Sequence, residues 1–382
     1  MNRITKSVSK ISFYLFIPGF LLYYIIVTFG IGIPFLGNYL GIIGGLLIIP
    51  NMICYLISKK FNLLDLVFIF WHIIIGLYSI YCYSIGIVSN NFELLNWSLG
   101  SIVFNILMYF ISANINYLYY SKSIIVIYYI INILVLVSTI MGKFFINLSG
   151  VSGFSLNYQD FAVLYTIFSS IIIYKYKNPI NIIMSLVILY FNGARTEFAI
   201  FVITVVLVKM FVYVKNGKYL KLLSAIVIML IFTRFFLLII KTIDSYSRMA
   251  SLLNLQNDAS SLYRTELLKV AMSTISNNPI WGNYGSYVIL NGGIGTNAHN
   301  ILSAWVNFGL IGFLFYLACP IYILFKTYHC CKETTYLYKT ILFLAIFITM
   351  AFIMSKSYNY IMFGFLLGIS NYFITNKKEE FV

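Results

Sequence analysis

The chain has 382 residues, of which 61% are hydrophobic and 9% are charged, and its mean hydropathy is +0.93. This composition excludes a water-soluble globular protein, because no soluble core could bury so much apolar surface, and it predicts an integral membrane protein. The net charge of +15 does not predict nucleic-acid binding, because the basic residues are spread over short loops and form no single patch.

Apolar stretches of roughly 17 to 25 residues favour a bundle of helices over a membrane β-barrel. We predict an all-α fold of about twelve transmembrane helices, which form a single polytopic membrane domain over residues 1–382. The first apolar run is long enough to span, so it is interpreted as a helix and not as a cleaved signal peptide. The predicted spans begin near Ser12, Leu36, Leu63, Trp97, Ser123, Gln159, Ile180, Thr196, Leu220, Asn300, Tyr336 and Tyr358.

The basic residues predict the orientation of these helices. With a cytoplasmic amino terminus, most of the 25 basic residues lie in inner loops, as the positive-inside rule requires, and both termini are then cytoplasmic. Most of the arginines are exceptions, because they lie in the outer half or on the outer side: Arg195, Arg234, Arg248 and Arg264. We therefore expect the outer side to need guanidinium groups, although outer acidic residues also offer pairing partners, above all for Arg248.

A long polar loop, from about residue 242 to residue 298, separates two predicted spans on the outer side. Within it, Ser260 or Ser261 is predicted to cap a helix that runs to about Ser276 and that an Asn-Asn-Pro sequence ends. Tyr263, Leu267 and Val270 are expected on one face of this helix, with Arg264 and Glu266 projecting elsewhere. The loop is therefore expected to contain a short interfacial helix that lies over the bundle.

Three motifs follow one another in the carboxyl-terminal half. Residues 193–195 read Gly-Ala-Arg at a predicted helix start, Arg264 begins the loop helix that ends in the Asn-Pro-Ile-Trp-Gly run of residues 278–282, and His299 with Asn300 precedes a Gly-Leu-Ile-Gly run. Together with the number of spans, these motifs resemble the O-antigen ligase and Wzy-type polymerase superfamily from about Gly150 to Gly312.

Two positions depart from the family pattern. Gln159 and Asp160 correspond only approximately to a Pro-Asn or similar pair that many members show, and Asn307 stands where many relatives carry Glu. Neither departure affects the Arg195, Arg264 or His299 positions of the three motifs.

The resemblance implies an enzyme of the bacterial inner membrane with one large periplasmic loop. Such an enzyme transfers a sugar chain from undecaprenyl pyrophosphate to an acceptor without a metal or other cofactor. Its expected partners are an undecaprenyl-pyrophosphate-linked oligosaccharide donor, an acceptor linked in the same way, and membrane lipid. A chain-length regulator protein is a further candidate partner.

The chemistry of the reaction suggests the same catalytic residues. Arg195 and Arg264 are expected to hold the pyrophosphate, because guanidinium binds phosphate oxygens bidentately and stays charged. His299 is expected to act as the general base that deprotonates the acceptor hydroxyl, with its pKa lowered by nearby guanidinium groups. The attack would invert the anomeric centre. The sequence contains no Asp-x-Asp motif that would hold a divalent ion.

Further residues are candidates for substrate binding. Arg234 lies below the outer end of its span and either binds a lipid-linked phosphate or reaches to the interface. Asp160 is the reserve base. The complete set of substrate-binding candidates is Arg234, Arg248, Asn300, Tyr263, Trp281 and Asp160. His72 is expected to be a buried histidine without a catalytic role.

The leading interpretation is a surface-polysaccharide (O-antigen) polymerase. It would move the growing glycan from undecaprenyl pyrophosphate to a lipid-linked repeat unit at the periplasmic face, and the extreme Ile, Phe, Tyr and Asn usage favours it over a ligase. An O-antigen ligase, which delivers the glycan to lipid A core, is the nearest alternative. A polysaccharide-lipid transporter is a third, but it would predict midplane ionisable groups and repeated halves.

Overall fold

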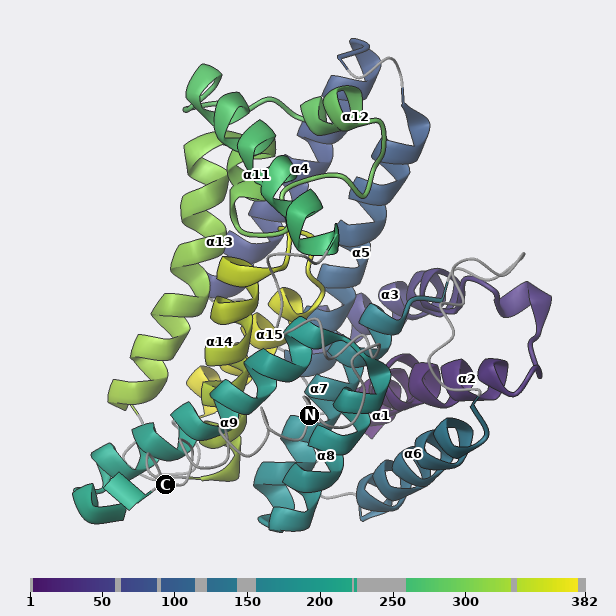
Figure 1. The fold of residues 1–382 in the computed structure, drawn as a ribbon, viewed down its shortest axis with the longest axis vertical. Helices are drawn as coiled ribbons and strands as arrows, with labels where there is room; N and C mark the ends of the chain where they lie inside the picture. The colour runs from purple at the N-terminus through teal and green to yellow at the C-terminus, as the bar shows by residue number, and fades with distance from the viewer. Residues whose placement is uncertain are drawn as a thin grey trace.

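The computed structural model describes residues 3–58, 63–87, 91–113, 122–142, 156–221, 223–224, 259–330 and 335–376. These ranges are helical and contain no β-strand (Figure 1). The α-helices are α1 (Arg3–Phe16), α2 (Pro18–Thr28), α3 (Tyr39–Ser58), α4 (Leu63–Ser84), α5 (Phe92–Ala113), α6 (Ser123–Ile140), α7 (Tyr158–Tyr176), α8 (Pro179–Asn192), α9 (Arg195–Lys215), α11 (Ala259–Asn277), α12 (Ser286–Asn291), α13 (Leu302–Cys330), α14 (Tyr336–Met354) and α15 (Met362–Asn376).

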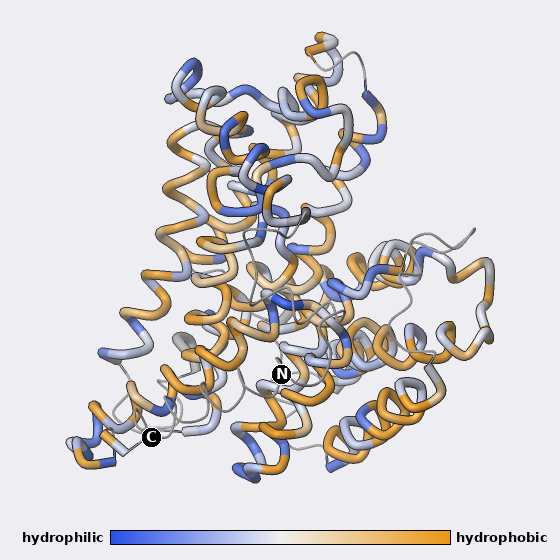
Figure 2. The backbone as a smooth tube through the Cα atoms, viewed as in Figure 1, coloured by the Kyte–Doolittle hydropathy of each residue, from blue (hydrophilic) through white to orange (hydrophobic). Residues whose placement is uncertain are grey.

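Within the described residues, 8 helical segments are long and apolar enough to cross a membrane. They are Ser7–Thr28, which joins α1 and α2, together with segments of α3, α4, α5, α6, α9, α13 and α14. Figure 2 shows apolar residues along these helices and more polar ones at helix ends and around α11 and α12. The prediction of an all-helical integral membrane protein is thus supported.

The remaining predicted spans have different outcomes. α7 forms a helix but is not among the candidate spans, and the apolar helices at Pro179–Asn192 and Met362–Asn371 are shorter. The span expected near Leu220 lies mostly outside the described residues, as does the first part of the predicted loop, up to Asp258. The total of about twelve spans, the periplasmic location of the loop and the cytoplasmic termini therefore stay predictions.

Two glycines allow α15 to approach α5 closely. Gly364 and Gly368 are separated by one helical turn, and a Cβ at either position would overlap backbone atoms of Asn105 or Tyr109 on α5. The Gly364 N–H also donates a hydrogen bond to Asn105 Oδ1 at 3.0 Å. Small residues at this spacing permit helix contact in membranes, where van der Waals packing and interhelical hydrogen bonds drive association.

A buried polar cluster joins four helices near the same interface. Asp65 of α4 accepts hydrogen bonds from Tyr55 of α3, Tyr109 of α5 and Asn371 of α15. Asn371 Nδ2 also donates to the two tyrosine oxygens, at 3.1 and 3.0 Å. All four side chains are buried. Because an unpaired carboxyl group is costly in a membrane interior, this cluster favours one arrangement of the four helices.

The polar segment after α11 docks into a kink of α13. Gly309 interrupts α13 with φ of 66° and ψ of −165°, and a Cβ there would overlap the Ile280 carbonyl. The Leu310 N–H bonds to the carbonyls of Pro279 and Ile280, both at 3.2 Å, and the Trp305 indole N–H donates to Pro279 O at 2.7 Å. The Asn-Pro-Ile-Trp-Gly and Gly-Leu-Ile-Gly motifs are therefore in direct contact.

The close approach of α15 and α5 yields a prediction for a matched pair of glycine variants. Gly364→Ala should destabilise the protein by about 1–3 kcal/mol, because overpacking forces backbone shifts. Gly76→Ala on α4 should be neutral or stabilising, because its new Cβ would lie 3.6 Å from Ile102 and alanine is the better helix former. Thermal unfolding in detergent measures both, and equal midpoints for the two variants would contradict the tight α5–α15 contact.

Candidate active site

A cavity of about 960 Å³ lies among α3, α5, the start of α7, the segment before α13 and the loop between α14 and α15. Its lining includes two predicted site residues, His299 and Asp160, and Lys356 of the loop. Asn and Gln side chains from several of these elements contribute to the same lining. The cavity therefore brings together residues from both halves of the sequence.

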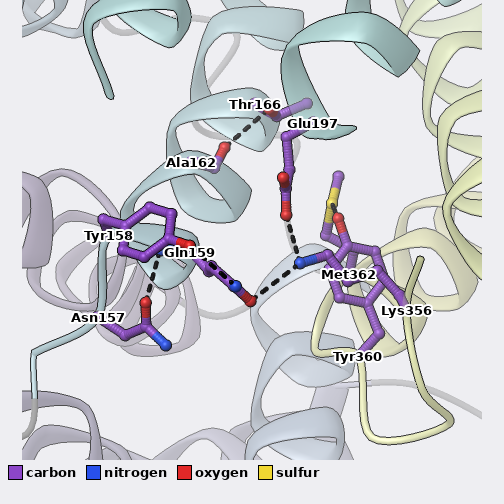
Figure 3. Close-up of polar contacts among 9 residues, drawn as sticks. All are labelled: Asn157, Tyr158, Gln159, Ala162, Thr166, Glu197, Lys356, Tyr360 and Met362. Carbon is purple, nitrogen blue, oxygen red and sulfur yellow. Dashed lines mark hydrogen bonds and ion pairs between the residues drawn. The ribbon is translucent and has the colours of Figure 1, made fainter. Parts of the chain in front are cut away.

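Lys356 is held in this region by a buried ion pair. Its ammonium group pairs with the Glu197 carboxylate in the first turn of α9, as Figure 3 shows. It also donates to Gln159 Oε1 at 3.4 Å and lies 5.6 Å from the centroid of the Tyr360 ring. Glu197 is only 4% exposed. The pair thus joins the starts of α7 and α9 to the loop between α14 and α15.

The start of α7 is ordered by a local cap. Asn157 has an extended backbone and its Oδ1 accepts the Gln159 N–H at 2.9 Å, an arrangement typical of an Asn at a helix amino terminus. Gln159 and Asp160 then follow within the first turn and line the cavity. Burial raises the pKa of Asp160 to about 6, with the Lys356 charge opposing this shift and the Glu197 charge adding to it.

His299 lines the cavity immediately before α13. Burial lowers the pKa of its imidazole to about 4, and the positive charges of Arg264 and Lys356 add to this effect. The ring is therefore neutral near pH 7 and has a nitrogen lone pair that can accept a proton. The expectation that a guanidinium group lowers the pKa of His299 agrees with this environment.

Contacts around His299 fix the start of α13. Asn300 Oδ1 accepts the Leu302 N–H at 3.0 Å, and the Ile301 N–H donates to Phe352 O at 2.7 Å at the end of α14. Ser303 Oγ accepts the Tyr358 N–H at 3.0 Å. The segment that carries His299 is thus tied to the loop that carries Lys356. Asn300 has this local capping role, and its predicted contact with substrate stays a prediction.

The structure corrects the expected orientation of α11. The helix runs from Ala259 to Asn277, so the predicted helix and its end are confirmed, whereas it begins before the expected cap at Ser260 or Ser261. Arg264 is partly buried and shares a stripe with the buried Leu267 and Ala271, whereas Tyr263 is 45% exposed. The prediction that Arg264 projects away from the face of Leu267 is wrong, because helical positions 264, 267 and 271 form the inner face.

Arg195 is the first residue of α9, two positions after the left-handed Gly193 that ends α8. Two positions later, Glu197 pairs with Lys356, and a spacing of two puts the two α9 side chains on different faces. No arginine is found among the described residues that line the cavity. The structure thus brings Arg264 and Lys356 near His299, while a direct role of Arg195 stays a prediction.

The other predicted residues lie away from the cavity lining or outside the described ranges. Trp281 is 75% exposed, in the segment that docks on the α13 kink. Arg234 and Arg248 lie outside the described residues. His72 is buried, as expected, and its Nδ1 lies 2.8 Å from Phe68 O.

Sequence reasoning missed Lys356 and its two partners, Glu197 and Gln159, as members of the site. A useful pattern was present, because Lys356 lies between two apolar runs on the predicted outer side, where the positive-inside rule disfavours lysine. The same departure from the positive-inside rule had indicated the arginines on the outer side as candidate site residues. In the described part of the chain, no group of three or more His, Cys, Asp or Glu side chains could hold a metal ion.

Comparison with known proteins supports the resemblance seen in the motifs. Residues 180–317 match a family model described as O-Antigen ligase, and this segment contains Arg195, Arg264 and His299 but ends before Lys356. No curated protein and no solved structure matches the chain. Over this segment, which is less than half of the chain, the protein is therefore similar to the O-antigen ligases.

Proposed function

We propose that this protein is a surface-polysaccharide polymerase that needs no metal. It transfers the growing glycan from undecaprenyl pyrophosphate to a lipid-linked repeat unit at the periplasmic face of the bacterial inner membrane. The observation that carries the proposal is a neutral, cavity-lining imidazole at His299 with Arg264 and Lys356 close enough to act on its charge. The family match over residues 180–317 supports the same class of reaction.

In the proposed reaction, a hydroxyl oxygen of the acceptor sugar attacks the anomeric carbon of the donor. The hydroxyl proton passes to the free nitrogen of His299, and the bond between the anomeric carbon and the diphosphate oxygen breaks. The electron pair of that bond leaves with the diphosphate, whose added negative charge is compensated by the guanidinium groups of Arg264 and Arg195. The anomeric centre is inverted.

The charges around His299 suggest why the base becomes effective only when the donor is bound. Arg264 and Lys356 disfavour the protonated imidazole in the structure without ligands. A diphosphate beside Arg264 would offset part of this positive charge, and the pKa of His299 would rise towards its ordinary value of 6.5. A base with a pKa nearer the working pH transfers protons more efficiently.

The same residues would serve an O-antigen ligase, because a ligase uses the same donor. The composition of the chain favours the polymerase, and the family match supports the two equally. A transporter is disfavoured by the position of His299 and Lys356 outside the described helices.

His299→Ala should mimic the loss of the gene, because a general base typically contributes about 10²- to 10⁴-fold in rate. Lipopolysaccharide from a deletion strain that carries this variant is separated on a silver-stained gel, and lipid A core bearing one repeat unit is expected. His329→Ala is the matched control, because His329 is an exposed residue near the other end of α13.

Each other gel pattern has a different meaning. Polymer of normal length in the His299→Ala strain, with the variant protein present in the membrane, would contradict the role of His299 as the general base. Naked core with polymer retained on the carrier lipid would identify a ligase. A complete block in the appearance of external repeat units would identify a transporter.

The environment of His299 also predicts a pH dependence that can be measured without the reaction. Diethyl pyrocarbonate modifies histidine only when its imidazole is neutral, so labelling of His299 should rise through a midpoint near pH 4. Arg264→Gln removes one cation and should move the midpoint upwards, towards 6.5, because protonation is then less costly. Mass spectrometry of the labelled peptide gives the midpoint.

Lys269→Gln provides the control for this measurement, because Lys269 is an exposed cation on the same helix. Its midpoint should equal that of the unmodified protein. A midpoint that does not move in Arg264→Gln would show that the guanidinium group does not act on His299.

A further inference from the structure

Side-chain amides dominate the polar lining of the cavity. They come from separate parts of the chain, with Asn38 before α3, Asn96 on α5, Asn157 and Gln159 at the start of α7, Asn297 beside His299 and Asn359 in the loop after α14. An amide offers both donors and acceptors and carries no charge. This lining is suited to a ligand with many hydroxyl groups.

Among its described lining residues, the cavity offers no unpaired cation. Lys356 is paired with Glu197, and Asp160 adds a carboxyl group with a pKa of about 6. The described lining residues include no arginine. A diphosphate would lose its hydration here without gaining a free cation, whereas a neutral sugar would meet no such cost.

Arg264 acts on the same imidazole from outside the described lining of the cavity. It adds to the lowering of the His299 pKa, and it projects from the inner stripe of α11. His299 therefore has a guanidinium group in its surroundings and an amide-lined cavity in contact with its ring. These are the two environments that a transferase needs for a charged leaving group and an uncharged acceptor.

The size and the aromatic residues of the cavity fit a carbohydrate. A volume of about 960 Å³ lies at the upper end of the range for small-molecule sites, about 300–1,000 Å³, so more than one sugar ring can enter. Trp97 and Tyr360 contribute aromatic surface. Gly100 also lines the cavity, and a Cβ there would meet no atom within 4 Å, so the space beside α5 is open.

We infer that this amide-lined cavity is the acceptor subsite, which binds the uncharged sugar rings of the incoming repeat unit beside His299 while the donor diphosphate lies outside it with Arg264. The inference rests on the proposed function and adds the location and the chemical class of the acceptor group. Lys356 is a positioning residue in this arrangement, because its bonds to Glu197 and Gln159 hold two walls of the cavity together.

Two probes separate the acceptor side from the donor side in the full-length protein. The first is the free oligosaccharide of one repeat unit, released from the polysaccharide of the producing strain, which should protect His299 from diethyl pyrocarbonate at neutral pH. The second is inorganic pyrophosphate, which should raise the midpoint pH of His299 labelling by its negative charge. Both readouts are independent of the transfer reaction.

The double variant Asn96→Ala with Asn359→Ala should raise the half-protecting oligosaccharide concentration about tenfold, as expected for two lost hydrogen bonds between neutral groups. It should leave the pyrophosphate effect unchanged. Arg264→Gln should show the converse, with normal protection by oligosaccharide and a smaller effect of pyrophosphate. Asn216→Ala, at the far end of α9, is the amide control and should leave both readouts unchanged.

Two results would overturn the acceptor subsite. One is a failure of the oligosaccharide to protect His299 at any concentration in the unmodified protein. The other is a pyrophosphate effect that Lys356→Gln abolishes and Arg264→Gln leaves intact, which would make the cavity the diphosphate site. Neither result touches the proposed function, which the His299→Ala gel tests separately.

Discussion

The ion pair between Lys356 and Glu197 is the contact on which the candidate site depends. It joins the loop after α14 to the start of α9, and the bond from Lys356 to Gln159 adds the start of α7. A buried charge without a partner costs several kcal/mol, on the order of 3–5 when one partner is removed. These three segments are therefore held together, and the cavity that they line keeps its shape.

A second constraint acts on the segment that follows α11. The carbonyl oxygens of Pro279 and Ile280 accept hydrogen bonds from backbone and indole N–H groups of α13. Only glycine fits at the kink of Gly309. This contact anchors the carboxyl-terminal end of α11. Because α11 presents Arg264 on its inner stripe, the docking of two loop motifs brings a guanidinium group near the imidazole.

Together, these two contacts give His299 two different electrostatic surroundings. Arg264 and Lys356 act on His299 through space, while the ammonium group of Lys356, which lines the same cavity, is compensated by Glu197. A transferase with two lipid-linked substrates must avoid binding both diphosphates at one place. A charged region for the donor and an amide-lined cavity for the acceptor sugar would meet this need.

The sequence by itself determined the helical membrane class, the starts of most of the described helices, the existence of a helix that ends near Ser276, and the candidate residues Arg264 and His299, which the structure brings near one another. These features follow from local hydropathy, helix-ending residues and short motifs, all of which are read within one segment. Only the tertiary structure decided that Arg264 faces inwards, that Tyr263 and Trp281 are exposed, and that Lys356, Glu197 and Gln159 belong to the site. The reason is physical, because Gln159 and Lys356 are 197 positions apart and nothing in either segment indicates the other. Their meeting depends on how the helices pack.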